Sequence, residues 1–361
     1  MEFTSSERRA RTMKKFKIFV LVFALLLIVG GGIGSVIFYQ KLEVERKASE
    51  VNKKFKYDGS EELVLELKNG ATVYLSPSQD DYVHMNKQGL TFSNNQNEST
   101  NWDIQKKDKK TLVTIDNKRQ HKKIQPSVFS FNDISDDSIS LRLPEKYKKI
   151  TIKGEKVDVN VNTLLLSQLE IQTNRGYIGI NDLSAQSLIV NNQHGDISVS
   201  QSKIEKNILL NTSSGNLSVD DTLFSELNMK VKNGDAFTAN TKGNITIDNQ
   251  NGQSEINHTK GSVNITNKNG DVFYHSNNIT HDVALETTHG NLTIELDKPS
   301  YNKNKFDLKT EYGLLSIFNK NLSSETTFTS NKGDALIKAT SKNGDITINE
   351  LDSDDTQYED H

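Results

Sequence analysis

Alternation of apolar and polar residues dominates the chain from about residue 150 onward. Aligned on one glycine, the segments read apolar-x-apolar-x-[Thr/Asn/Ser]-x-x-Gly-[Asp/Asn]-apolar-x-apolar. Around Gly195, the apolar positions are Leu188, Val190, Ile197 and Val199. Alternation with period two is typical of a half-buried β-strand, and this stretch shows no helical period. The pattern therefore predicts a series of strands that are joined by turns.

The spacing of the turn glycines favours a coiling β-solenoid over a stack of antiparallel hairpins. Steps of 19 or 20 residues separate the glycines from Gly176 to Gly234, and steps of nine separate those from Gly234 to Gly270. Two short steps nearly equal one long step, so a coil of about 18 to 20 residues would stack its strands about 4.8 Å apart. We predict an all-β, single-stranded β-solenoid with these glycines at its corners, in left-handed turns. The corner glycines are Gly176, Gly195, Gly215, Gly234, Gly243, Gly252, Gly261, Gly270, Gly290, Gly313, Gly333 and Gly344.

An uncharged apolar segment of another kind spans residues 18–39. At about 1.5 Å per residue, a helix of this length crosses a hydrocarbon core of about 30 Å. Basic residues dominate the segment before it, so the positive-inside rule places the N-terminus in the cytoplasm. The alternative is a signal peptide cleaved near the small residues 30–35, but the apolar run continues to Tyr39, which favours an anchor. We predict a single-pass protein of the cell membrane with the bulk of its chain extracytoplasmic.

Composition shifts divide the chain into further segments. Residues 62–149 show strands without the regular repeat, which predicts a β-rich N-terminal cap over the open end of the solenoid. The last residues are acidic and nearly without apolar side chains, which is typical of disorder. The predicted organisation is a cytoplasmic basic tail (1–17), a transmembrane helix (18–39), a helical or flexible stalk (40–61), the cap (62–149), the solenoid (150–351) and a disordered acidic tail (352–361).

The glycine-centred repeat behind an N-terminal anchor resembles the bacterial putative-adhesin family of β-strand repeat proteins. The LiaG-like membrane-anchored proteins of Gram-positive envelope-stress operons belong to that family. The resemblance covers about residues 62–348 and includes a strand-proline-strand lead-in at 139–152. The family has no catalytic motif to transfer. The resemblance therefore implies a role at the cell surface or in the envelope.

Composition narrows the classes of function further. The chain has 44 Lys and Arg against 47 Asp and Glu, so no strong overall field favours nucleic acid as a partner. Cysteine is absent, which excludes disulfides, thiolate metal sites and cysteine nucleophiles. No phosphate loop, dinucleotide fingerprint or hydrolase motif occurs. We expect no cofactor, no metal and no catalytic residue.

Two groups of residues are candidates for contact with a ligand or partner. Phe237 and Phe273 lie 36 residues apart at positions that alternation directs to solvent, and two coils of 18 residues would bring them to one face. A basic run flanks the strand at 112–115 and could meet anionic polymers or lipid headgroups. The alternative is that these residues only protect a strand edge from pairing. The basic run consists of Lys106, Lys107, Lys109, Lys110, Lys118, Arg119, Lys122 and Lys123.

Calcium binding and catalysis are the alternatives to an interaction protein. Gly-Asp pairs at nine-residue spacing resemble the calcium-binding nonapeptide roll, but its doubled glycine is missing, which favours plain turn aspartates. Acid–base chemistry needs two groups held together, whereas the acidic residues occur singly at corners. We predict a non-enzymatic, membrane-anchored protein for adhesion, envelope interaction or stress sensing, whose partner is an envelope polymer or a membrane protein. A polysaccharide-modifying β-helix enzyme and a regulator of a neighbouring signalling protein are the alternatives.

Overall fold

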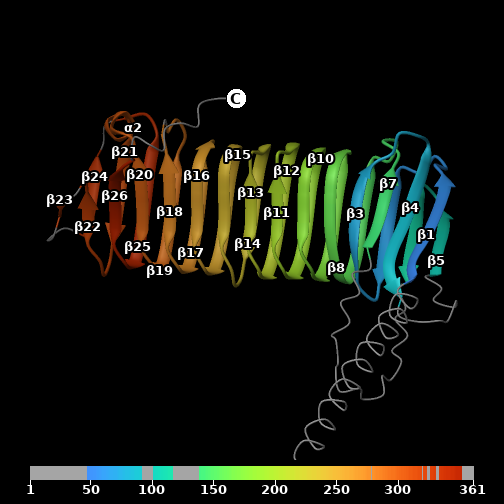
Figure 1. Ribbon diagram of the computed structural model, residues 1–361. Coiled ribbons are helices and arrows are strands. Elements are labelled where there is room, and N and C mark those ends of the chain that lie inside the picture. Colours follow the sequence, from blue (N-terminus) through green and yellow to red (C-terminus); the bar gives the residue numbers. More distant parts are fainter. Residues whose placement is uncertain are drawn as a thin grey trace, which may run out of the picture.

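The computed structural model describes residues 47–91, 101–116, 138–277, 279–318, 320–322, 326–330 and 333–351. These residues form an all-β rod whose strands lie side by side along one axis (Figure 1). The described part contains one short helix, α2 (Lys298–Lys303), and no helix long and apolar enough to cross a membrane. The predicted basic tail, transmembrane helix and acidic tail lie outside the described residues.

The rod is a solenoid with two long parallel sheets, here named face A and face B. Neighbouring coils pair in parallel, as Leu188 with Ile208 on face A and Ile178 with Ile197 on face B. The longest strands bend at a corner and contribute to both faces. In spatial order, face A consists of β6 (Lys110–Asp116), β2 (Glu62–Lys68), β8 (Lys149–Leu165), β9 (Gln168–Arg175), β10 (Ile178–His194), β12 (Lys203–Ser214), β14 (Leu223–Val231), β15 (Ala236–Asn251), β17 (Val263–Asn269), β19 (Val283–His289), β25 (Leu336–Asn343) and β21 (Lys305–Thr310). Face B consists of β7 (Ser138–Leu143), β3 (Ala71–Pro77), β8, β10, β11 (Ile197–Ser200), β13 (Leu217–Asp220), β15, β16 (Ser254–Lys260), β18 (Val272–Ser276), β20 (Leu292–Leu296), β26 (Ile346–Glu350) and β22 (Leu315–Ile317).

The corner glycines stack in two columns at two different corners of the coil. A Cβ on Gly252 would collide with the carbonyl oxygen of Gly234, and a Cβ on Gly261 with that of Gly243. The nine-residue spacing therefore alternates between two corners of one 18-residue coil. Positive φ angles occur at all the predicted corner glycines except Gly313. The longer column is Gly176, Gly195, Gly215, Gly234, Gly252, Gly270, Gly290, Gly344 and Gly313 in spatial order.

A further corner, which the sequence analysis did not identify, consists of left-handed residues other than glycine. These residues follow five consecutive glycines of the longer column at a constant offset of six positions, and their φ angles lie between 45° and 53°. Asn and Asp tolerate this conformation better than other side chains. This constant offset from the glycines would have allowed the corner to be predicted from the sequence. The five residues are Asp182, Gln201, Asp221, Asn240 and His258.

The repeating Thr, Asn or Ser of the template points into the core. Asn249 and Asn267 are 1% exposed, and their Nδ2 atoms donate to the carbonyl oxygens of Gly234 and Gly252 at 3.1 and 3.0 Å. A buried carbonyl without a partner would destabilise the fold, so these side chains complete the glycine corner from inside. The surrounding apolar template positions are buried in one continuous core.

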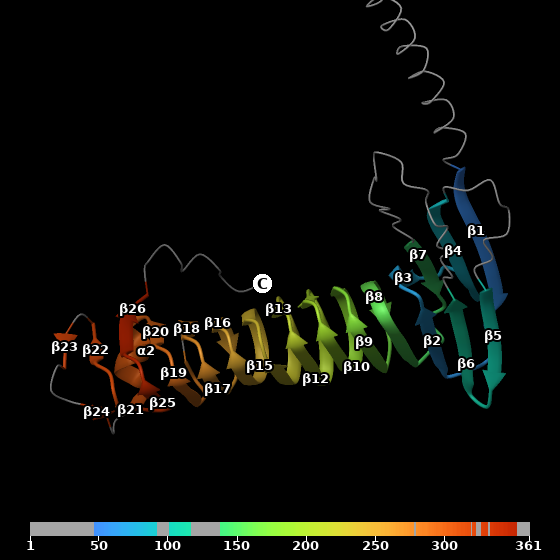
Figure 2. The ribbon, with the colours of Figure 1, turned by 90° about the horizontal axis from the view of Figure 1, so that it is seen from below.

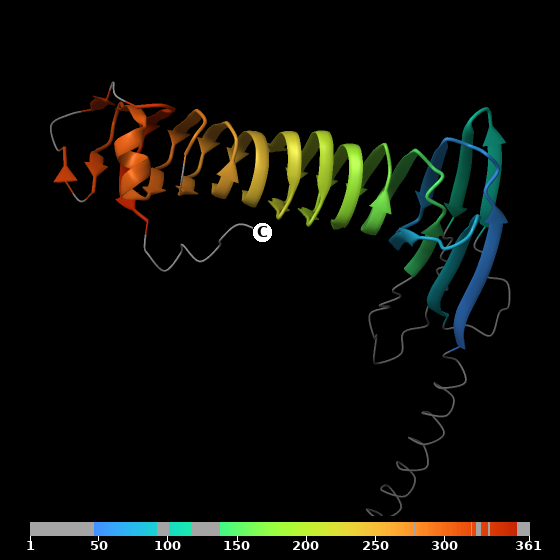
Figure 3. The ribbon, with the colours of Figure 1, turned by 90° about the horizontal axis from the view of Figure 1, so that it is seen from above.

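Both ends of the solenoid depart from chain order. At the C-terminal end, β25 lies between β19 and β21, and β26 lies between β20 and β22. The chain leaves one coil position open after β20, forms the outermost coil with β21 and β22, and returns with β25 and β26 to fill the gap. The orange helix α2 lies at this end of the rod (Figure 3). Short antiparallel strands β23 (Lys320–Asn321) and β24 (Thr327–Ser330) pair with this outermost coil.

The N-terminal end combines the first coils with antiparallel strands. Residues 62–68 and 71–77 pair in parallel with β8, so coils of the solenoid already occur within the segment that was predicted as a cap. Residues 47–56 differ from the predicted helical or flexible stalk, because they form β1 (Lys47–Lys56), which pairs with β4 (Tyr82–Thr91). Together with β5 (Asn101–Lys107), these strands lie at one end of the rod (Figure 2). Such antiparallel additions cover the edges of a parallel stack.

Candidate functional site

Face A carries a groove of about 710 Å³ that crosses five coils. Outward side chains two residues apart on each strand form its two walls, and the residue between them lies in the floor. One wall consists of Gln172, Asn191, Asn211, Lys230 and Asp248, and the other consists of Asn174, Gln193, Ser213, Lys232 and Gln250.

Parallel pairing in register brings the amides of each wall together. Asn191 pairs with Asn211, and Asn211 with Lys230, so equivalent side chains repeat about every 4.8 Å along the rod. The Nδ2 atom of Asn211 donates to the Oδ1 atom of Asn191 at 2.7 Å. The Oδ1 atom of Asn211 is buried without a partner among the described residues. Asn191 and Asn211 therefore form an amide pair across two coils, and one acceptor is left over.

The groove is nearly uncharged. Its charged lining residues are Lys230, Lys232 and Asp248. Amides and hydroxyls both donate and accept hydrogen bonds, which suits a ligand rich in hydroxyl or amide groups. Glycoside hydrolysis generally uses two carboxylates, whereas Asp248 is the only one in this lining. The groove has the shape and the polar groups that an extended polar molecule would need.

The aromatic pair expected from the sequence lies on face B. Phe237 pairs with Glu255 and Glu255 with Phe273, so the two rings point outward from one column, two coils apart. Both are half-buried. The Phe273 ring lies parallel to that of His275, with 6.5 Å between centroids. Contact of these rings with a ligand stays a prediction.

The same face carries two exposed tyrosines that the sequence analysis missed. Tyr74 and Tyr177 are 44% and 45% exposed. The Tyr177 ring covers Gly179, since a Cβ there would lie 2.8 Å from Tyr177 Cε1. Tyr177 follows Gly176 at the position where the template has Asp or Asn, and this departure from the pattern was the available signal.

The described part of the basic run contacts carboxylates of its own chain. Lys109 and Lys110 lie 3.2 and 2.7 Å from Glu61 and Glu62, and Lys106 donates to the Asp58 carbonyl at 2.7 Å. The hydrogen bond to Glu62 raises the pKa of Lys110. These contacts offset part of the positive charge that an anionic surface would meet. Lys107 is exposed on the same hairpin, whereas Lys118, Arg119, Lys122 and Lys123 lie outside the described residues.

The turn aspartates link neighbouring coils. Asp196 accepts a hydrogen bond from the backbone N–H of Asn216 at 2.7 Å, and Asp235 from that of Gln253 at 2.8 Å. The carboxylates thus serve the next coil rather than converging on one point. Among the residues that the structure describes, no three His, Asp or Glu side chains are grouped to hold a metal ion. These contacts give the Gly-Asp pairs a structural role.

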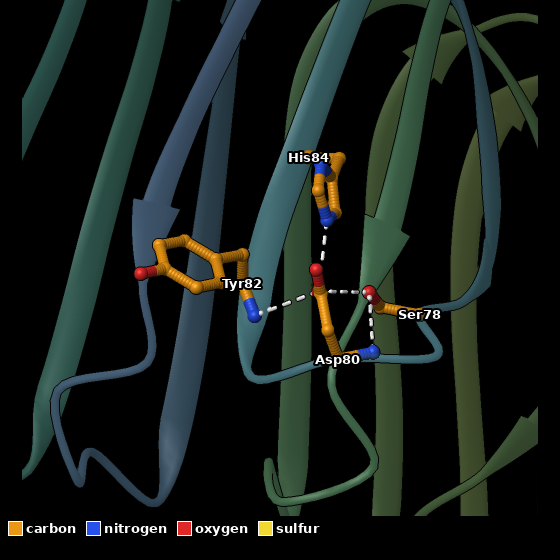
Figure 4. A network of polar contacts seen from close by, with 4 residues as sticks. All are labelled: Ser78, Asp80, Tyr82 and His84. Carbon is orange, nitrogen blue, oxygen red and sulfur yellow. Dashed lines mark hydrogen bonds and ion pairs between the residues drawn. The ribbon is translucent and has the colours of Figure 1, made fainter.

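Ser, His and Asp side chains meet at the turn before β4. The Oδ1 atom of Asp80 accepts hydrogen bonds from His84 Nε2 at 2.8 Å, Ser78 Oγ at 2.9 Å and the Tyr82 N–H at 3.0 Å (Figure 4). A nucleophilic triad needs the imidazole between the carboxylate and the hydroxyl. Here the carboxylate lies between the other two groups, so His84 is not placed to accept the Ser78 proton. The cluster stabilises a turn.

These hydrogen bonds, foremost that from His84, lower the pKa of Asp80 to about 2. Because this value lies below the ordinary value of 3.8, the stability contributed by the carboxylate should be complete above about pH 4 and should be lost as the pH falls through about 2. NMR titration of the carboxyl carbons should show Asp80 titrating near pH 2. His84→Ala should raise this pKa further than Ser78→Ala. A pKa near 3.8 in the native protein would contradict the network.

Comparison with known protein families gives a match that occurs twice along the chain. Residues 60–245 and 206–349 each match the family model of Toastrack DUF4097. No curated protein matches the chain. Similar solved structures include a putative adhesin from Parabacteroides distasonis (11% identity, 83% of this chain and 98% of that chain, TM-score 0.42), a putative adhesin from Parabacteroides merdae (13%, 84% and 97%, 0.41) and a putative lipid binding protein from P. distasonis (12%, 85% and 98%, 0.38).

The two family matches overlap and together extend over most of the chain, from the first coil to the last. The predicted resemblance to an adhesin-type family of β-strand repeats is confirmed, whereas the likeness to LiaG-like proteins stays a prediction. The chain belongs to the Toastrack family.

Proposed function

We propose that this protein is a non-enzymatic adhesion or interaction protein of the cell envelope, anchored by residues 18–39 with its N-terminus in the cytoplasm. The rod would hold a binding surface outside the membrane. The twelve strands of face A are separated by eleven spacings of about 4.8 Å, which makes a rod of about 53 Å. The observation that carries the proposal is the amide-lined groove of face A.

The groove suits adhesion because it is long, polar and rigid. Its walls stand on paired strands, and the column of corner glycines along the edge of face A keeps neighbouring coils in close contact. An extended polymer could therefore make the same contact repeatedly, and weak contacts add when they are linked. A single carboxylate in the lining gives less support to the alternative of a polysaccharide-modifying enzyme.

Retention of isolated cell-wall material on the purified full chain tests this proposal. The triple variant Asn191→Ala, Gln193→Ala and Asn211→Ala should bind at least about tenfold less material, because it loses several hydrogen bonds of about 0.5 to 1.5 kcal/mol each. The matched control is Ser198→Ala with Ser218→Ala, which changes face B at the same coils.

A second experiment, on intact cells that carry the protein, checks whether the rod lies outside the membrane. Protease added to intact cells should remove the bulk of the chain if the solenoid lies outside the membrane. Equal retention of wall material by the triple variant and the control would refute the role of the groove, and full protection from protease would refute the orientation.

A further inference from the structure

We infer that the face A groove takes a linear glycan with spaced carboxylate groups, the sugars lying along the uncharged coils and one carboxylate between Lys230 and Lys232. This inference rests on the proposed adhesive function and names the class of polymer. It is carried by the shape of the groove, its hydrogen-bonding groups and the position of its charges.

The shape of the groove fits one extended chain that runs along the rod. The two walls are separated by two residues along each strand, or about 6.7 Å, and each wall repeats about every 4.8 Å. The floor is formed by strand segments whose own side chains, such as Asn192 and Thr212, are buried. The lining contains no aromatic residue, and its one large apolar side chain, Val231, is itself 3% exposed. A lipid chain or an apolar peptide would find little surface there.

The three coils at one end present only amides and hydroxyls. Gln172, Asn191 and Asn211 lie on one wall, and Gln193 and Ser213 on the other. Each amide offers donors and an acceptor, which matches the mixed character of sugar hydroxyls and acetamido groups.

The fourth coil carries a cation on each wall. Lys230 lies on β14 and Lys232 directly after its end; both are exposed, one on either side of the floor residue Val231. Neither ammonium group forms an ion pair within the described part of the chain. A carboxylate in the groove would therefore meet two donors at once.

The fifth coil limits how much negative charge the ligand can carry. Asp248 pairs in register with Lys230 and lies on the same wall. In a polymer with an anion on every ring, one negative group would be repelled by Asp248. Others would lie against the uncharged coils, where no cation is present in the lining to pair with them. The arrangement thus favours an anion on some rings only.

Calorimetric titration of the full chain in detergent micelles with three hexasaccharides tests the inference. Hyaluronan has a carboxylate on alternate rings, the N-acetylglucosamine hexamer is neutral, and heparin is densely charged. We expect hyaluronan to bind tightest, by about tenfold over the neutral hexamer. Lys230→Gln and Lys232→Gln should each weaken hyaluronan binding about three- to tenfold and should affect binding of the neutral hexamer less. The control Lys203→Gln removes a lysine outside the groove.

Three outcomes would overturn the inference. Equal affinity for hyaluronan and the neutral hexamer would show that the groove does not recognise a carboxylate. Tightest binding of heparin would show that it does not select a glycan with spaced charges. If the folded protein bound none of the three hexasaccharides, the ligand would not be a glycan of this class. If the protein still retained cell-wall material in a way that depends on Asn191 and Asn211, the adhesive function would stand with a different ligand. If it bound neither the three glycans nor the cell-wall material, both proposals would be refuted.

Discussion

Gly252→Ala should lower the melting temperature of the protein by about 10 °C. Gly252 has φ +141°, a region that side chains rarely adopt, and the added Cβ would collide with the carbonyl oxygen of Gly234. Strain of this kind costs about 1 to 3 kcal/mol. Relief of the collision would separate two coils, and the hydrogen bond from Asn267 to the Gly252 carbonyl at 3.0 Å would weaken. We expect a total loss of about 3 to 5 kcal/mol, measured by thermal unfolding with circular dichroism.

Two other glycines separate the causes of this effect. Gly59 has φ +86° but open space around its Cα, so Gly59→Ala should show the strain alone, about 1 kcal/mol. Gly179 lies outside the left-handed region, and its added Cβ would meet the movable Tyr177 ring, so Gly179→Ala should cost little. If the Gly252→Ala and Gly179→Ala variants had the same melting temperature, the column of corner glycines would not control the stability of the protein.

Ile197→Asp should destabilise the solenoid by about 4 kcal/mol or more. Ile197 is 1% exposed and lies in a buried column between Ile178 and Leu217 of the neighbouring coils. A carboxylate there would be surrounded by apolar side chains without a partner, and it would also leave unfilled volume. Denaturant unfolding of the purified protein measures the loss.

Ser198→Asp is the matched control, since Ser198 lies on the same strand and points to the outside of face B. Its effect should stay within about 0.5 kcal/mol, as for most surface changes. Similar destabilisation by the two substitutions would show that alternation along this strand does not separate core from surface.

The sequence by itself determined the strands, their buried faces and the length of a coil. Each depends on residues that are close in the chain, because alternation with period two sets which side is buried and glycine sets where the backbone turns. The shared face of Phe237 and Phe273 follows from the same arithmetic, since two coils of 18 residues separate them. The sequence analysis did not identify Tyr177, because Tyr177 occupies a position where the template has Asp or Asn.

The groove was not recognised from the sequence, although its wall residues lie four and two positions before consecutive glycines of the longer column. Its walls take one residue from each of five coils, and none of Asn191, Asn211 or Lys230 belongs to a motif within its own segment. The contact between the side chains depends on the register between coils, as in the pairing of Asn191 with Asn211. The ion pairs of Lys109 and Lys110 likewise join residues far apart in the chain.

The tertiary structure alone decided the order of the coils at the ends and which corner each glycine occupies. Asn291 accepts a hydrogen bond from the backbone of Asp345, 54 residues away, because the last coil of the chain fills a gap inside the stack. The coils share the same alternation and most share a corner glycine, so the local pattern fits one neighbour as well as another. Which coils meet depends on how the apolar faces, the connecting segments and the strand edges are all satisfied together, and these are long-range contacts.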